Sequence, residues 1–68
     1  MITKEEFTSS IEGYEHVLNR KNQFGWNVYG TLYEDQFSFF VPDYDVGENP
    51  TEKELDDKAY EIYIKENE

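Results

Sequence analysis

The chain of 68 residues contains no cysteine, which excludes disulfide bonds, thiolate nucleophiles and cysteine zinc sites. Basic residues are scarce, because only 6 Lys and Arg stand against 16 Asp and Glu, giving a formal net charge of −10. Such an excess repels DNA, RNA and anionic lipid, so we expect no direct binding to nucleic acid or membrane. Long apolar runs and a signal-peptide pattern are also absent. We therefore expect a cytoplasmic protein.

Aromatic residues are abundant, at 18% of the chain, and they argue against intrinsic disorder despite the high net charge. A chain of this length buries only about 60% of its unfolded surface, which leaves little room for a large internal cavity. The sequence therefore predicts a single small domain over residues 1–68. Its start at Met1 without a tag suggests a complete short open reading frame, and a cloned fragment with an added Met is the alternative.

The first part of the chain has the pattern of an amphipathic helix over residues 4–19. Thr3 and Glu6 have the spacing of a capping box, in which each side chain bonds the backbone N–H of the other residue. Apolar residues then recur at intervals of four, three and four and form one stripe, namely Phe7, Ile11, Tyr14 and Leu18.

From Phe24 onward the apolar period changes to two, and a second run follows from Gln36 to Val41, which predicts a β-hairpin. With Glu34 and Asp35 as the loop, Gly30 would pair with Phe39, whose ring could lie across the glycine. A loop of four or five residues is the alternative, since Glu-Asp is not a favoured turn pair.

A second capping box, Thr51 and Glu54, predicts a helix from 52 to about 66. Residues 60–64 also alternate like a strand, but no helix breaker precedes them. The predicted fold is therefore a small α+β domain of order α-β-β-α, with an antiparallel hairpin covered by two helices. Its expected core is Phe7, Ile11, Tyr14, Leu18, Trp26, Val28, Leu32, Phe37, Phe39, Val41, Leu55, Ala59 and Ile62.

Residues suited to catalysis or to metal binding are few. His16 is the only imidazole and is expected to face water, and no serine lies in a glycine-rich elbow, so we expect no enzyme. Asp43 to Glu54 resembles the spacing of a calcium loop, but Gly47 falls where an oxygen ligand is needed and Glu48 where glycine is needed. We expect an acidic turn leading into a capped helix, and no metal or cofactor.

Exposed aromatic residues form the first candidate interaction surface. Tyr29, Tyr33 and Phe40 would lie on the side of the hairpin away from the helices, and Tyr60 and Ile64 on the back of the second helix could extend this surface. Through that aromatic face the chain could form a homodimer, as a small structural or adaptor protein.

Uneven charge forms the second candidate surface. Residues 34–68 hold twelve acidic residues against three lysines, a net charge of −9, whereas residues 1–33 are close to neutral. Clustered acidic residues lower the stability of the fold by repelling one another, and a basic partner would relieve that repulsion. The alternative is that an acidic surface only keeps a small protein soluble. This profile resembles, in composition alone, the DNA-mimic inhibitors of phages and mobile elements, such as anti-CRISPR, antirestriction and uracil-glycosylase inhibitor proteins.

The resemblance implies a non-enzymatic inhibitor or regulator that blocks the basic nucleic-acid site of a host protein such as a CRISPR nuclease, a restriction enzyme or a DNA-repair enzyme. Carboxylates would stand in for phosphates, and tyrosine and phenylalanine rings would act as anchors. The expected partner-binding residues are Glu34, Asp35, Asp43, Asp45, Glu48, Glu54, Asp56, Asp57, Glu61, Tyr29, Tyr33, Phe40 and Tyr44.

Overall fold

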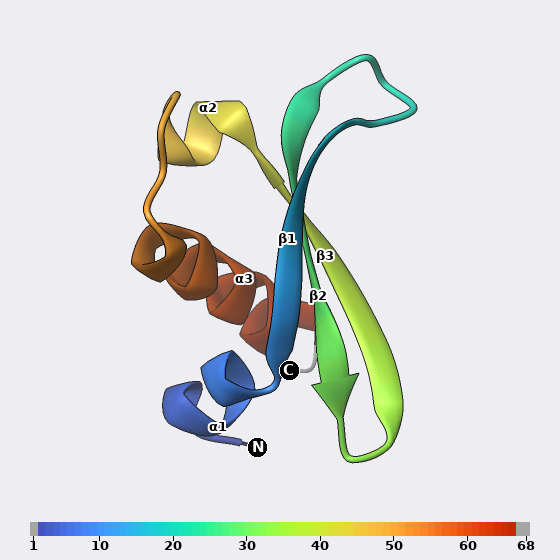
Figure 1. The fold of residues 1–68 in the computed structure, drawn as a ribbon, viewed down its shortest axis with the longest axis vertical. Coiled ribbons are helices and arrows are strands. Elements are labelled where there is room, and N and C mark those ends of the chain that lie inside the picture. Colours follow the sequence, from blue (N-terminus) through green and yellow to red (C-terminus); the bar gives the residue numbers. More distant parts are fainter. Residues whose placement is uncertain (1, 67–68) are drawn as a thin grey trace.

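A three-stranded antiparallel sheet carries all of the helices on one side in the computed structural model, which describes residues 2–66 (Figure 1). The elements in chain order are α1 (Lys4–Ser9), β1 (Ile11–Leu18), β2 (Phe24–Leu32), β3 (Asp35–Pro42), α2 (Asp43–Val46) and α3 (Glu52–Glu66). The strands lie in the order β1-β2-β3, so that β1 and β3 are the two edges. The α+β class is as predicted, but the order is α-β-β-β-α-α instead of α-β-β-α.

The predicted helix over residues 4–19 is wrong beyond Ser9. Its start is confirmed, because the Glu6 amide donates to Thr3 Oγ1 at 3.1 Å and the Thr3 amide donates to Glu6 Oε1 at 3.2 Å. At its end, the amide and the hydroxyl of Ser10 both donate to the carbonyl of Phe7, at 3.0 and 2.6 Å. These two hydrogen bonds to one carbonyl end the helix, and the chain continues as β1.

A β-bulge in β1 explains why the apolar residues of this strand are spaced as in a helix. The pairing of β1 with β2 shifts between Ile11 and Gly13, so one extra residue is inserted. Ile11 and Tyr14, three apart, therefore both pack against the core. Tyr14 and Leu18, four apart, share a side in a strand as they would in a helix. The apolar stripe thus fits both structures, and the bulge cannot be seen in the spacing.

The β2–β3 turn is formed by Tyr33 and Glu34, not by Glu34 and Asp35. Both turn residues have positive φ, 50° and 71°, as a two-residue type I′ turn requires. Gly30 accordingly pairs with Phe37 instead of Phe39. The register is two residues from the predicted one, and because side chains alternate with a period of two, the expected faces of the hairpin are retained.

Helix α3 has the bounds that the second capping box predicts. The Glu54 amide donates to Thr51 Oγ1 and the Thr51 amide to Glu54 Oε1, each at 3.2 Å. Residues 60–64 are helical, so their alternation of apolar and polar residues does not produce a strand. Instead, Tyr60 turns inward and its hydroxyl donates to the carbonyl of Ile2 at 3.1 Å.

The core lies between the sheet and the helices and is centred on Phe7, which is fully buried. Its ring contacts the rings of Phe37 and Tyr63 at centroid distances of 5.2 and 5.1 Å. All predicted core residues pack here except Leu18, which is 52% exposed at the end of β1. The core has four further members that were not predicted, Ile2, Val46, Tyr60 and Tyr63. No helix within residues 2–66 is long and apolar enough to cross a membrane.

Candidate interaction surface

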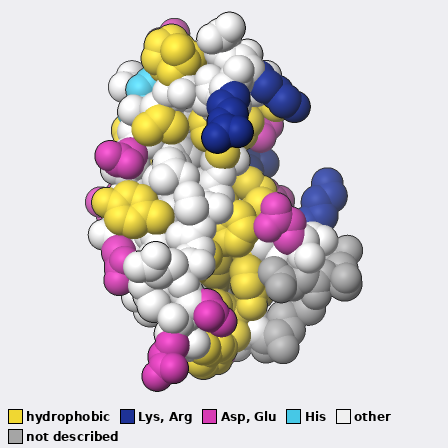
Figure 2. Space-filling view, turned by 90° about the vertical axis from the view of Figure 1, so that its right-hand side faces the viewer, with side chains coloured by type: hydrophobic (Ala, Val, Ile, Leu, Met, Phe, Trp, Pro, Cys, Tyr) yellow, Lys and Arg dark blue, Asp and Glu magenta, His cyan; other side chains and the backbone are white. Residues whose placement is uncertain are grey.

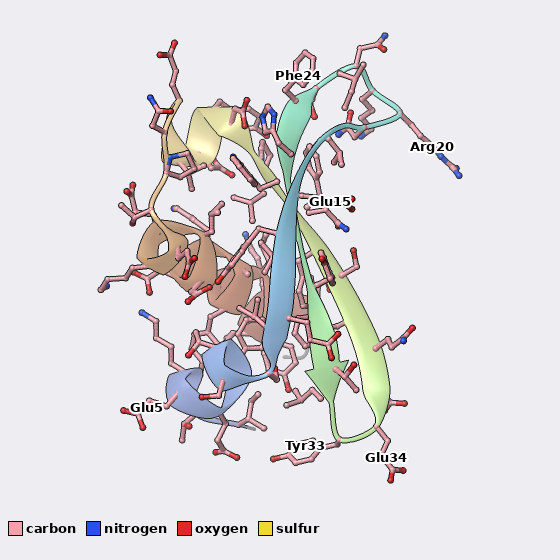
Figure 3. The ribbon with its side chains drawn as sticks, in the orientation of Figure 1. Glu5, Glu15, Arg20, Phe24, Tyr33 and Glu34 are labelled. Carbon is pink, nitrogen blue, oxygen red and sulfur yellow. The ribbon has the colours of Figure 1, made fainter. Side chains whose placement is uncertain are left out.

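The expected acidic site residues fall into separate places on the molecule. Glu34 and Asp35 lie at the β2–β3 turn, where Figure 3 shows Glu34 projecting from the end of the hairpin. Helix α2, with Asp43 and Asp45, lies at the opposite end of the long axis (Figure 1). Because the molecule extends 31 Å along that axis, the turn and α2 cannot contact one compact site together.

Four expected site residues on α3 are engaged within the chain. Asp56 Oδ1 accepts a hydrogen bond from Tyr14 Oη at 2.5 Å, and Glu54 belongs to the capping box. Glu61 pairs with Lys58 at 3.3 Å. Asp57 pairs with Lys4 of α1 and with Lys53, and these two ammonium groups lower the pKa of its carboxyl. Asp56 and Asp57 therefore tie α3 to β1 and α1, whereas the bonds of Glu54 and Glu61 are local to α3.

Three of the carboxylates that have no partner among the described residues lie close together in sequence, between α2 and the first turn of α3. Asp45, Glu48 and Glu52 make no side-chain hydrogen bond and no ion pair within the described part of the chain. Asp43, at the start of α2, faces Nε2 of His16 at 3.1 Å. We call these four residues, Asp43, Asp45, Glu48 and Glu52, the acidic edge. Lys53 and Lys58, the nearest lysines along the chain, pair with Asp57 and Glu61.

Tyr44 is the aromatic residue that belongs to the acidic edge. It lies on α2 between Asp43 and Asp45 and is 75% exposed. An open groove of about 580 Å³ is lined by Asp45 and by residues of α3, including Lys58, Ile62, Ile64 and Lys65. The edge thus offers an exposed ring, and its Asp45 borders a groove lined by both apolar and lysine side chains.

Of the other expected aromatic anchors, Tyr29 and Phe40 lie on the helix-free side of the sheet as predicted, but the three rings do not form one continuous patch. Tyr29 lies across Gly13 of β1, where a Cβ would come within 2.7 Å of Tyr29 Cζ. Phe40 lies across Gly25, four residues from Tyr29 along β2, which corresponds to about 13 Å. Tyr33 points away from both, because its hydroxyl donates to Glu6 Oε2 at 3.2 Å. Each ring therefore has a local structural role.

The structure also has a basic tip that was not predicted as a candidate surface. Arg20 and Lys21 lie in the β1–β2 loop and have no carboxylate partner among residues 2–66. Arg20 projects from the end of this loop (Figure 3), and Lys and Arg side chains gather mainly near the upper end of the helix-free side (Figure 2). Leu18 and Phe24, 52% and 57% exposed, pair at the base of the loop.

His16 is not merely solvated as expected. It stacks on the ring of Phe24, with centroids 5.6 Å apart, and approaches Asp43 from 27 residues away in sequence. No local pattern could have predicted that contact. It ties β1 to α2, and it places a partly exposed titratable side chain at the boundary between the basic tip and the acidic edge.

Groups that could carry chemistry are dispersed or occupied. The hydroxyl of Ser10 caps α1, and that of Ser38 donates to Asn27 Oδ1 at 2.5 Å. Within residues 2–66, no three His, Asp or Glu side chains converge as a metal-binding group, and residues 43–46 of the calcium-like pattern form helix α2.

Comparison with models of known protein families, with curated proteins and with solved structures gives no match to this chain.

Proposed function

We propose that the protein is a non-enzymatic, cytoplasmic inhibitor or regulator that binds the basic nucleic-acid site of another protein through the acidic edge. The observation that carries this proposal is the set of carboxylates at Asp45, Glu48 and Glu52, which have no partner within residues 2–66. A marginal domain that gathers unneutralised charge in this way loses stability through self-repulsion. A basic partner would offset that loss on binding.

The acidic edge would take the place of phosphates. Carboxylates on α2, on the following connection and on the first turn of α3 would accept hydrogen bonds from lysine and arginine side chains that otherwise contact nucleic acid. Tyr44 would be the desolvated anchor, because it is the most exposed large hydrophobic residue of the described chain and lies between two of these carboxylates.

This mechanism predicts competition with nucleic acid that depends strongly on salt. Opposite charges accelerate association, and added salt screens them, since the Debye length falls from about 10 Å at 0.1 M to about 3 Å at 1 M. The test is displacement of labelled DNA or RNA from a panel of nucleases, uracil-DNA glycosylases and repressors over an ionic-strength series. We expect displacement from at least one of them, weakening steadily as salt is added.

A matched pair of triple variants separates the acidic edge from net charge. Neutralising Asp45, Glu48 and Glu52 (to Asn, Gln and Gln) and neutralising Glu5, Glu15 and Glu66 (each to Gln) both raise the net charge by three. Only the first triple should weaken inhibition, by about tenfold or more. Equal losses in both triples, inhibition indifferent to salt, or no displacement from any panel member would refute the proposal.

A further inference from the structure

The outer edge of β3 carries hydrogen-bonding groups without a partner. In a two-residue hairpin the residues next to the turn exchange both hydrogen bonds, and the pairs then alternate along the strands. From the closing pair of Leu32 with Asp35, the backbone groups of Gln36, Ser38 and Phe40 must point away from β2. Within residues 2–66 no other backbone group bonds to these three residues. Pro42, which has no N–H, takes the next outward position, as is usual on an edge strand.

The two edges of the sheet differ in their protection. Natural edge strands avoid pairing with other chains by means of charges and bulges. β1 has both, with Glu12 and Glu15 along it and the bulge near Ile11. β3 has neither, since no charged residue follows Asp35 before the strand ends at Pro42.

Apolar side chains border this unprotected edge. Phe37 and Phe39 are only partly buried and line an open groove of about 290 Å³ on the core side of β3. Phe40, also partly exposed, lies on the other side of the sheet. An added strand would therefore gain backbone hydrogen bonds together with aromatic contacts on both sides.

We propose that β3 pairs in an antiparallel manner with β3 of a second copy of this chain, across a two-fold axis at Ser38, and that this pairing forms a six-stranded sheet. In that register Ser38 faces Ser38 of the second copy and Gln36 faces its Phe40, so all three outward residues are used. Phe37 then lies opposite Phe39 of the second copy, which gives an aromatic cross-strand pair on the helix side.

Charge restricts the register in which two copies can pair. With the axis at Ser38, Asp35 faces Val41 of the second copy and Glu34 faces its Pro42, so no acid opposes another. Moving the pairing so that Ser38 faces Phe40 would set Asp35 against Asp43, a like-charge pair that opposes association. The uncharged strand is therefore self-complementary in this register, as an isologous two-fold interface requires, and of the registers without opposed acids it is the one that pairs all three outward residues with one another.

The test is the oligomeric state, measured by sedimentation equilibrium from micromolar to millimolar protein at low and high salt. We expect a reversible dimer that becomes tighter as salt screens the repulsion between two acidic molecules. Proposed binding to a basic partner has the opposite salt dependence, so the two proposals can fail independently. A chain that stays monomeric at millimolar concentration in high salt would overturn this one.

Charge substitution at Ser38 tests the register directly. Ser38→Lys and Ser38→Glu each set like charges face to face and should weaken dimerisation by about fivefold or more. An equimolar mixture of the two variants should restore the dimer, because the ammonium group of one variant would then face the carboxylate of the other across the axis. Glu15→Gln, which changes the net charge as Ser38→Lys does but on the β1 edge, should leave dimerisation unchanged.

Amide exchange supplies a readout that does not depend on the variants, should they fold poorly without the Ser38–Asn27 hydrogen bond. Protection of the Gln36, Ser38 and Phe40 amides in the unmodified protein should rise with protein concentration. A dimer that Tyr29→Ala abolishes and that both Ser38 variants retain would be face-to-face, and would refute pairing through β3.

Discussion

A single hydrogen bond ties the β1 edge of the sheet to α3. Tyr14 Oη donates to Asp56 Oδ1 at 2.5 Å, across 42 residues of sequence. Burial first, and then the carboxylate acceptor, raise the pKa of the Tyr14 phenol above its ordinary value of 10.0. Asp56 therefore stabilises the fold, although its place in an acidic run suggested a partner-binding role.

Replacing Tyr14 by Phe should lower the free energy of unfolding by about 1 kcal/mol at neutral pH, since one hydrogen bond to a carboxylate is lost. A pKa raised in the folded state contributes stability that is present below the unfolded pKa and is lost as the pH rises through the folded pKa. The wild type should thus lose this contribution above about pH 10, and the variant has none to lose.

The difference between the two proteins in urea unfolding should therefore shrink from about pH 9 to about pH 11. Tyr44→Phe is the control, because its exposed hydroxyl has no bond within residues 2–66, and it should behave as wild type. A Tyr14→Phe difference that stays constant over this range would show that ionisation of Tyr14 is not linked to folding.

The elements that could be predicted are those set by contacts between residues close together in the sequence. Both capping boxes fix helix starts through bonds between residues three apart, and α3 runs over its expected range. β1 was not predictable, because its bulge at Ile11 gives apolar residues a helical spacing. The candidate site followed the same division: the acidic run is visible in sequence, but the His16–Asp43 and Lys4–Asp57 contacts depend on the tertiary fold.

The hairpin register was predicted wrongly because the turn is formed by residues that are unfavourable at positive φ. Tyr33 and Glu34 both adopt the left-handed region, which glycine and asparagine occupy more readily. Glu34→Gly should therefore raise the free energy of unfolding by about 1 kcal/mol, by relieving the strained φ. Asp35→Gly is the matched control, since it removes the same charge one residue later, in the strand, and should be destabilising. Equal effects in urea unfolding would indicate that the lost charge, not the turn, is responsible.

At the scale of the whole molecule, attraction and repulsion between charges are unevenly distributed. Lys4 and Lys53 converge on Asp57, and Lys58 neutralises Glu61, so the lysines of α1 and α3 are largely used on neighbouring carboxylates. Asp45, Glu48 and Glu52 of the acidic edge have no such compensation within residues 2–66, and two of the cations without an ion pair, Arg20 and Lys21, lie in the β1–β2 loop. Repulsion should therefore exceed attraction in the free protein, whose formal net charge is −10.

Added NaCl should consequently raise the free energy of unfolding, by an amount on the order of 1 kcal/mol, because it screens the repulsion more than the few exposed ion pairs. Neutralising Asp45, Glu48 and Glu52 together should stabilise the protein at low salt and flatten this dependence, whereas removing the Asp57 carboxylate (Asp57→Asn) should steepen it. Urea unfolding at several salt concentrations measures both slopes. Stability that falls with salt would mean that the ion pairs dominate, and that the free protein has no excess repulsion for a basic partner to relieve.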